Sequence, residues 1–214
     1  MKENRLELIQ RILKLLIGLF IAAIGITTML RANIGLPPWD VLHMGITKVI
    51  PVSMGQAIII VSVILTLIGV LLGEKIGVGT ICNMFLVGTF IDLIINSQII
   101  PQGKNFIIGF LMLNLGLMIL AIGTVIYMSC ELGCGSKDGV TMGINKRINQ
   151  PVKYVRAGLE MLAIIIGMFM GAEFSLVTIY SALVFGFLMQ FSFKILKCNA
   201  SNLKHRSIKE LFVE

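Results

Sequence analysis

Two short stretches of this sequence carry polar side chains whose spacing suits the binding of an ion or a small solute. In the first stretch they are Asp40, His43 and Thr47, and in the second they are Asp138, Thr141 and Asn145. On an α-helix, residues spaced i, i+3 and i+7 lie on one face. A carboxylate can bind a cation or a proton, and imidazole, hydroxyl and amide groups can line its path. Each stretch therefore predicts a helix with a polar stripe.

These two stretches belong to a repeat that extends along the chain. Residues 33–48 match residues 131–146 without a gap, and Asp40 and Asp138 are 98 positions apart (138 − 40). The same offset relates glycines outside the stretches, such as Gly69 and Gly167. Matched glycines at a single offset are hard to obtain by chance from apolar sequence, and small residues suit close packing of membrane helices. The pattern predicts a duplicated protein.

The composition indicates a membrane protein. Of 214 residues, 57% are hydrophobic and 14% are charged, whereas soluble domains carry about 25% charged residues. The net charge of +7 comes from basic residues at the ends of apolar runs rather than from one patch. That placement favours membrane orientation over nucleic-acid binding. The lipid bilayer is therefore the expected partner, and no nucleic-acid partner is expected.

Six apolar runs are long enough, or nearly so, to cross the bilayer, which takes about 20 residues. They are residues 12–30, 55–73, 76–96, 106–128, 157–171 and 174–195. The first run lacks a small-x-small cleavage site, so we interpret it as a retained span. Two-residue connections at 74–75 and 172–173 predict tight helical hairpins for the second with the third run and the fifth with the sixth.

Basic residues orient these spans with both termini in the cytoplasm, because most of them then lie inside. We expect one membrane domain over residues 1–214. It contains a first repeat of three spans at 10–97, a second at 108–197, and a cytoplasmic basic tail at 198–214. Because each repeat has an odd number of spans, the second copy must insert upside down relative to the first. Secondary transporters often use this inverted arrangement, with the substrate site at the repeat interface.

Each repeat also contains a short helix, expected at 38–50 and 136–148. Pro38 suits a first helical turn, where no N–H is needed. Thirteen residues span only about 20 Å, too short to cross, so each short helix is broken or re-entrant. The alternative is a helix that lies flat at the interface, where Asp40 and Asp138 only pair with free N–H groups of the first turn. Trp39 fits both alternatives.

Further candidates have weaker patterns. Asn83 could face the central chamber or hydrogen-bond a neighbouring helix. Asp92 and Glu160 lie near helix ends, where they could snorkel to the interface instead of binding a solute. The four cysteines are interpreted as ordinary reduced thiols, because a metal site would need more ligands near them. No P-loop and no nucleophile–base pair stands out, so we expect neither an enzyme, a metal nor a cofactor.

Three motifs resemble those of the YczE/YyaS/YitT-like family of bacterial membrane proteins. They are Ala-Asn-Ile-Gly-Leu-Pro-Pro-Trp-Asp at 32–40, Gly-Thr-Ile-Cys-Asn at 79–83 and Gly-Thr-Phe-Ile-Asp at 88–92. The resemblance covers about residues 10–197 and implies a location in the bacterial cytoplasmic membrane, with transport the presumed role. The second copy has Gly-Ser-Lys-Asp in place of Pro-Pro-Trp-Asp, so the halves are not expected to be functionally equivalent.

We therefore expect an all-α polytopic membrane protein of six transmembrane helices, arranged as an inverted 3+3 repeat. Its expected function is that of a small secondary transporter of a small solute or ion. The expected binding residues are Trp39, Asp40, His43, Thr47, Asn83, Asp138, Thr141 and Asn145. Two alternatives stay open: a non-transporting accessory protein that stabilises or regulates a partner complex, and the substrate-capturing subunit of an ATP-driven importer. A homodimer or a partner membrane protein is possible.

Overall fold

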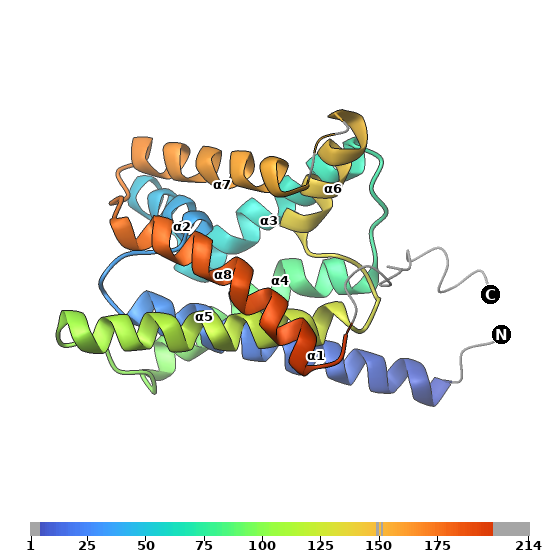
Figure 1. Ribbon diagram of the computed structural model, residues 1–214, viewed down its shortest axis with the longest axis horizontal. Coiled ribbons are helices and arrows are strands. Elements are labelled where there is room, and N and C mark those ends of the chain that lie inside the picture. The colour runs from blue at the N-terminus through green and yellow to red at the C-terminus, as the bar shows by residue number, and fades with distance from the viewer. Residues whose placement is uncertain (1–4, 149, 151, 199–214) are drawn as a thin grey trace.

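The computed structural model describes residues 5–148, 150 and 152–198, and over these residues the chain is all-helical. Eight helices follow one another in this part of the chain: α1 (Arg5–Arg31), α2 (Pro38–Val49), α3 (Met54–Leu71), α4 (Val78–Ser97), α5 (Phe106–Met128), α6 (Ser136–Ile148), α7 (Val152–Phe169) and α8 (Leu176–Ile195). Figure 1 shows them as one bundle whose long helices run roughly along its longest axis. Of the expected tail, residues 199–214 lie outside the described residues.

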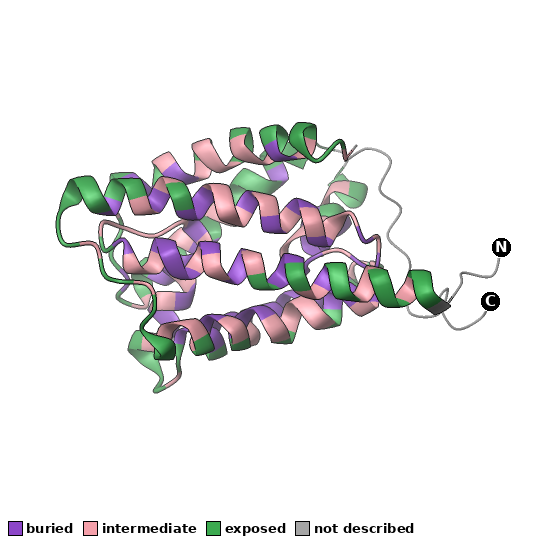
Figure 2. Ribbon diagram, turned by 90° about the horizontal axis from the view of Figure 1, so that it is seen from below, coloured by how far each residue is buried: buried purple, intermediate pink, exposed green. Residues whose placement is uncertain are grey.

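Five of these helices are long and apolar enough to cross a membrane: α1, α3, α4, α5 and α8. Their outer faces are apolar, with Leu71 79% and Leu176 80% exposed. Figure 2 shows the exposed residues on the outside and at the ends of the bundle and the buried ones facing inward. An all-helical, multi-pass membrane protein is thus supported. The sixth expected span corresponds to α7, which is not among the five candidates and carries Lys153, Arg156 and Glu160.

The two halves of the chain have matching backbones. Helices α3 and α4 begin and end 98 positions before α7 and α8 (152 − 54 and 176 − 78). The loops before the short helices match as well, since Gly35 and Gly133 have φ values of 136° and 131°. Residues with side chains avoid these values, so glycine is required at both turns. The sequence repeat is therefore a repeat of local structure.

Helices α1 and α5 form the centre of the packing, and small residues let their backbones meet. A Cβ atom on Gly25 would lie 2.5 Å from Leu120 N, and one on Gly123 would lie 2.5 Å from Ala22 N. These contacts are equivalent under the 98-residue offset, because Gly25 corresponds to Gly123 and Ala22 to Leu120. The same interface thus occurs twice, once from each helix.

Each short helix packs on a long helix of the other half: α2 on α7, and α6 on α3. A Cβ atom on Gly167 of α7 would lie 2.6 Å from the Val41 carbonyl oxygen of α2. At the equivalent place, a Cβ atom on Gly69 of α3 would lie 3.8 Å from Gly139 of α6. The α2–α7 contact is therefore the tighter of the two.

The expected hairpins are confirmed for α3 with α4 but wrong for α7 with α8. Helices α3 and α4 pack closely, and a Cβ atom on Gly55 would lie 2.1 Å from the Gly88 carbonyl oxygen. Helices α7 and α8 are joined by a short turn but diverge without close packing, as Figure 1 shows. The position of Gly55 is taken by Lys153 in α7, whose ammonium is costly to bury against apolar helices.

Candidate functional site

The first turn of α2 holds a buried pair of polar side chains. His43 Nδ1 lies 3.1 Å from Asp40 Oδ1, and both residues are buried. Because a carboxylate only accepts hydrogen bonds, the Nδ1–H group is the donor. His43 Nε2 is buried without a hydrogen-bond partner. Through its Nδ1–H group, the imidazole holds the Asp40 carboxylate in place.

The first turn of α6 forms the second part of the site. Thr66 Oγ1 of α3 donates a hydrogen bond of 2.9 Å to Ser136 Oγ, which ties this helix end to the bundle. Next to it, a Cβ atom on Gly135 would lie 2.9 Å from the Tyr127 hydroxyl, 3.3 Å from Asp138 Oδ2 and 3.7 Å from Asn83 Oδ1. Polar groups from α4, α5 and α6 therefore converge beside Gly135, where the absence of a side chain leaves room.

Lys137 connects the two parts of the site. Its Nζ atom lies 4.9 Å from the centre of the Trp39 ring, and its charge interacts with Asp40 and Asp138. Trp39 and Lys137 occupy equivalent positions in the repeat (137 − 39 is again 98). When two repeat-equivalent residues touch, they lie close to the place where the two halves meet. The aspartates that follow them in sequence therefore belong to one central cluster.

Helix α7 adds an ion pair to this cluster. Arg156 Nε lies 3.1 Å from Glu160 Oε1, and both residues interact electrostatically with Lys137. Arg156 also interacts with Asp138, and its guanidinium lies 5.7 Å from the centre of the Phe185 ring of α8. Three carboxylates and two cations thus come together at the start of both short helices, an arrangement that can hold a cation or transfer a proton.

The structure brings together Trp39, Asp40, His43 and Asp138, with Asn83 beside Asp138. The remaining three expected residues are engaged with nearby backbone oxygens. Thr47 and Thr141 donate hydrogen bonds of 2.8 Å to the backbone oxygens of Met44 and Lys137. The Asn145 amide donates to the Gln150 backbone oxygen. A role for these three in lining a path stays a prediction.

Sequence reasoning missed three members of the cluster, Tyr127, Lys137 and Arg156, and treated a fourth, Glu160, only as a weaker candidate that could snorkel to the interface. One signal was available for Lys137, which directly precedes the matched aspartate, where the first copy has Trp39. From the sequence alone, its charge is equally explained as one of the basic residues that orient a membrane protein. Arg156 and Glu160, spaced i and i+4, pair on one face of α7. Nothing in the sequence indicates that this face reaches the other repeat.

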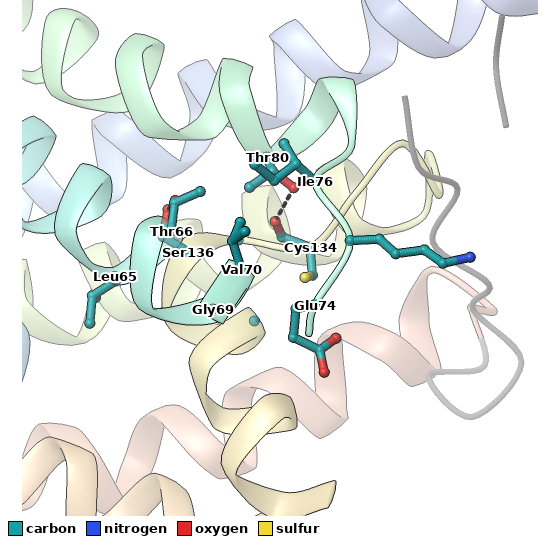
Figure 3. A pocket seen from close by; sticks show the side chains of 12 residues that line it. Leu65, Thr66, Gly69, Val70, Glu74, Ile76, Thr80, Cys134 and Ser136 are labelled. Carbon is teal, nitrogen blue, oxygen red and sulfur yellow. Dashed lines mark hydrogen bonds between the residues drawn. The ribbon is translucent and has the colours of Figure 1, made fainter. Parts of the chain in front are cut away.

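A small cavity lies beside the start of α6. Its volume is about 20 Å³, room for one water. Figure 3 shows its lining, including Thr66, Ser136 and Cys134, and the hydrogen bond of 2.8 Å from Thr80 Oγ1 to the Cys134 backbone oxygen. Burial raises the pKa of Cys134 to about 11. The thiol is therefore protonated at neutral pH and a poor nucleophile.

Fold and site together define a helical integral membrane protein with a charged centre. The chain belongs to a family described as "Family of unknown function (DUF6198)", whose model matches residues 9–194. A Haemophilus influenzae relative described as "Uncharacterized protein" is 28% identical over 182 residues, covering 85% of this chain and 83% of the relative.

Two Bacillus subtilis relatives are similar to the chain over a comparable length. The one described as "Uncharacterized membrane protein YczE" is 28% identical over 82% of this chain and 81% of its own length. The one described as "Uncharacterized protein YyaS" is 25% identical over 81% of this chain and 87% of its own length. No solved structure matches the chain. The resemblance found in the sequence motifs to YczE and YyaS is thereby confirmed.

Proposed function

We propose that this protein is a small secondary transporter of the bacterial cytoplasmic membrane. It moves a small solute or ion through the charged centre between two inverted repeats. The observation that carries the proposal is the meeting of charged residues from both repeats inside a membrane protein, with Lys137 of the second repeat over Trp39 of the first. Ionisable residues inside membrane proteins are expensive to maintain and mark functional pathways by default.

The inverted-repeat architecture is supported by the equivalence of contacts between the halves. The Gly25 and Gly123 contacts are related by the repeat offset, and each short helix packs on the opposite repeat. We propose that α7 is the sixth span. The ion pair of Arg156 and Glu160 interacts electrostatically with Lys137, which accounts for the composition of α7 being less apolar than that of the other spans. The two repeats then have three spans each and opposite orientations.

We also propose that α2 and α6 are re-entrant, each starting at the centre and running back to its own side. Two contacts support this. At the end of α2, Lys48 Nζ donates a hydrogen bond of 2.7 Å to the Gly171 backbone oxygen. At the end of α6, Lys146 Nζ lies 2.7 Å from Glu74 Oε1. Both lysines therefore place the last turn of a short helix near a connection between two long helices, α7 with α8 for Lys48 and α3 with α4 for Lys146. Asp40 and Asp138 lie in the first turn, at the opposite end of each short helix.

Transport is tested with liposomes that contain this chain alone and a pH-sensitive dye. They are challenged with gradients of alkali cations, ammonium compounds, amino acids and simple anions. We expect flux of one class, with at least a tenfold loss in Asp40→Asn and in Asp138→Asn. Asp92→Asn is the matched control, because this carboxylate accepts hydrogen bonds from Ser53 and Gly55 at the start of α3 instead. Equal flux in all variants would contradict the proposal.

Topology is tested by single cysteines at positions 40 and 138 in a cysteine-free background. A membrane-impermeant maleimide is applied to cells and to inside-out vesicles. Protection of both positions, or accessibility that changes sides with solute, is expected for a gated centre. Free labelling of position 40 from outside only and of position 138 from inside only would mean that both short helices lie at the surface.

One observation favours the accessory alternative. Helices α7 and α8 do not pack closely, and their apolar faces carry exposed side chains such as Phe169 (88%) and Phe187 (72%). A helix of a partner membrane protein would fit an opening of this kind. Purification in a mild detergent distinguishes the two functions: this alternative predicts a partner retained in defined proportion and no flux from the chain alone.

A further inference from the structure

The ammonium group of Lys137 occupies a position that is built for a cation. It lies over the face of Trp39, 4.9 Å from the ring centre, and its charge interacts with Asp40 and Asp138. It forms no ion pair with any carboxylate of the described residues. The lysine side chain keeps some exposure to solvent, and its stem of four carbons is flexible. Its ammonium group can therefore leave this position without disturbing the backbone of α6.

The surroundings of this position select for a monovalent cation. Three carboxylates (Asp40, Asp138 and Glu160) share the centre with Lys137 and Arg156. When the Lys137 ammonium leaves, only Arg156 opposes these carboxylates, and a monovalent cation in its place restores the lost positive charge. His43 interacts with Lys137 and keeps its buried Nε2 atom without a partner.

The same surroundings favour an organic ammonium over a metal ion. An aromatic face attracts an alkylammonium ion, and methylated ammonium ligands are bound in proteins in this way. Metal ions instead require several oxygen or nitrogen ligands. Among the described residues, no three His, Cys, Asp or Glu side chains are arranged to hold a metal ion.

We propose that the centre binds a small organic ammonium ion, which takes the place of the Lys137 ammonium over Trp39, where the charges of Asp40 and Asp138 attract it. The inference rests on the proposed function, since it names the class of solute for the same site. In the empty protein Lys137 acts as an internal competitor. Its ammonium group neutralises the carboxylates, and a ligand of the same chemistry displaces it.

The experiment uses the fluorescence of Trp39, the only tryptophan in the chain. The purified full-length protein is titrated with tetramethylammonium and with choline at constant ionic strength. The matched ligand control is 3,3-dimethylbutan-1-ol, which has the shape of choline without its charge, and sodium chloride controls for salt. We expect a saturable change with both ammonium compounds and none with either control. A linear change, or one that the neutral compound reproduces, overturns the inference without any mutation.

Variants then test whether the Lys137 ammonium competes with the ligand. Lys137→Met keeps most of the side-chain volume and removes the charge, so apparent affinity for tetramethylammonium should rise about tenfold as the site becomes free. Asp40→Asn and Asp138→Asn should each weaken binding by at least tenfold. The matched control is Lys153→Met, because Lys153 Nζ also lies 4.9 Å from an aromatic ring, that of Tyr154, on an exposed part of α7. Equal affinity of Lys137→Met and wild type, both eluting as a single species, would overturn the inference.

The outcomes separate the two proposals. Ammonium binding without flux in liposomes would contradict the transporter and leave the binding site established. Flux of another class of solute, with no ammonium-specific change at Trp39, would contradict the inference and leave the transporter in place.

Discussion

The pair α3–α4 in the first half and its counterpart α7–α8 in the second have the same helix bounds but different packing. In the first pair, Gly55 and Gly88 bring the backbones into contact, and Asp92 of α4 accepts hydrogen bonds from the Ser53 hydroxyl and the Gly55 N–H group. In the second pair, a Cβ atom on Gly186, the counterpart of Gly88, would meet nothing within 4 Å.

The difference follows from few substitutions. The counterparts of Gly55 and Asp92 are Lys153 and Gln190. A lysine cannot fill the place of a glycine at a helix contact, and a neutral amide is a weaker acceptor for the start of the neighbouring helix. The repeat thus keeps its backbone path while one interface is lost. Helix α7 is free to carry Arg156 and Glu160 toward the centre instead of packing on α8.

The interface between α1 and α5 serves as the reference for the other interfaces, because its Gly25 and Gly123 contacts are equivalent under the 98-residue offset. Gly25→Leu and Gly123→Leu should each abolish the yield of folded protein, since a Cβ atom alone would lie 2.5 Å from backbone nitrogen in either case. The measurement is the amount of monodisperse protein in detergent. A difference between the two variants would mean that the halves are not equivalent at their centre.

The next largest effect on stability is expected where the α3–α4 and α7–α8 pairs differ. Gly88→Leu should destabilise the protein by about 3 kcal/mol, because the leucine has no space beside Gly55. Gly186→Leu should change stability by less than about 0.5 kcal/mol, as for a surface substitution. Both are read as unfolding temperatures in the same detergent. Similar losses in the two variants would show that α7 and α8 pack closely in solution.

A smaller effect is expected where the short helices pack on the opposite half. Gly167→Ala should cost about 2 kcal/mol, because its Cβ atom would meet the Val41 carbonyl oxygen at 2.6 Å. Gly69→Ala has a nearest neighbour at 3.8 Å and should gain about 0.5 kcal/mol from the better helix propensity of alanine. Thermal unfolding followed by Trp39 fluorescence checks both. A loss in Gly69→Ala would contradict the looser α3–α6 contact.

The smallest effect is expected from the hydrogen bonds between α3 and α4. Asp92→Ala should cost roughly 1 kcal/mol, since two bonds to the start of α3 are lost but the carboxylate is only half-buried. Gln190→Ala, its counterpart, should be neutral. Hydrogen exchange at the first turn of α3 provides the measurement, with faster exchange expected only in Asp92→Ala. Unchanged exchange would show that the Ser53 cap alone holds this end.

Much of this architecture could be predicted from the sequence, because its signals are local. Apolar length determined the long helices, and Pro38 with the matched aspartates indicated the short ones. The equivalent positions of Asp40 and Asp138 at the starts of the two short helices followed from the repeat. The role of α7 could not be predicted, because Arg156 and Glu160 reach the centre only through packing on α2 of the other half. The separation of α7 from α8 depends on Lys153. From the sequence alone, this lysine is explained equally well as one of the basic residues that orient the protein in the membrane.

The packing of α2 on α7 and of α6 on α3 also constrains biosynthesis. Helix α7 begins about 100 residues after α2 ends, and at ordinary synthesis rates that distance corresponds to about 5–20 s. During that interval Val41 and Gly45 lack their contacts with Gly167 of α7. The first half therefore cannot complete its structure as it leaves the ribosome, although all its own residues are present. Maturation of the protein must wait until α7 has been synthesised.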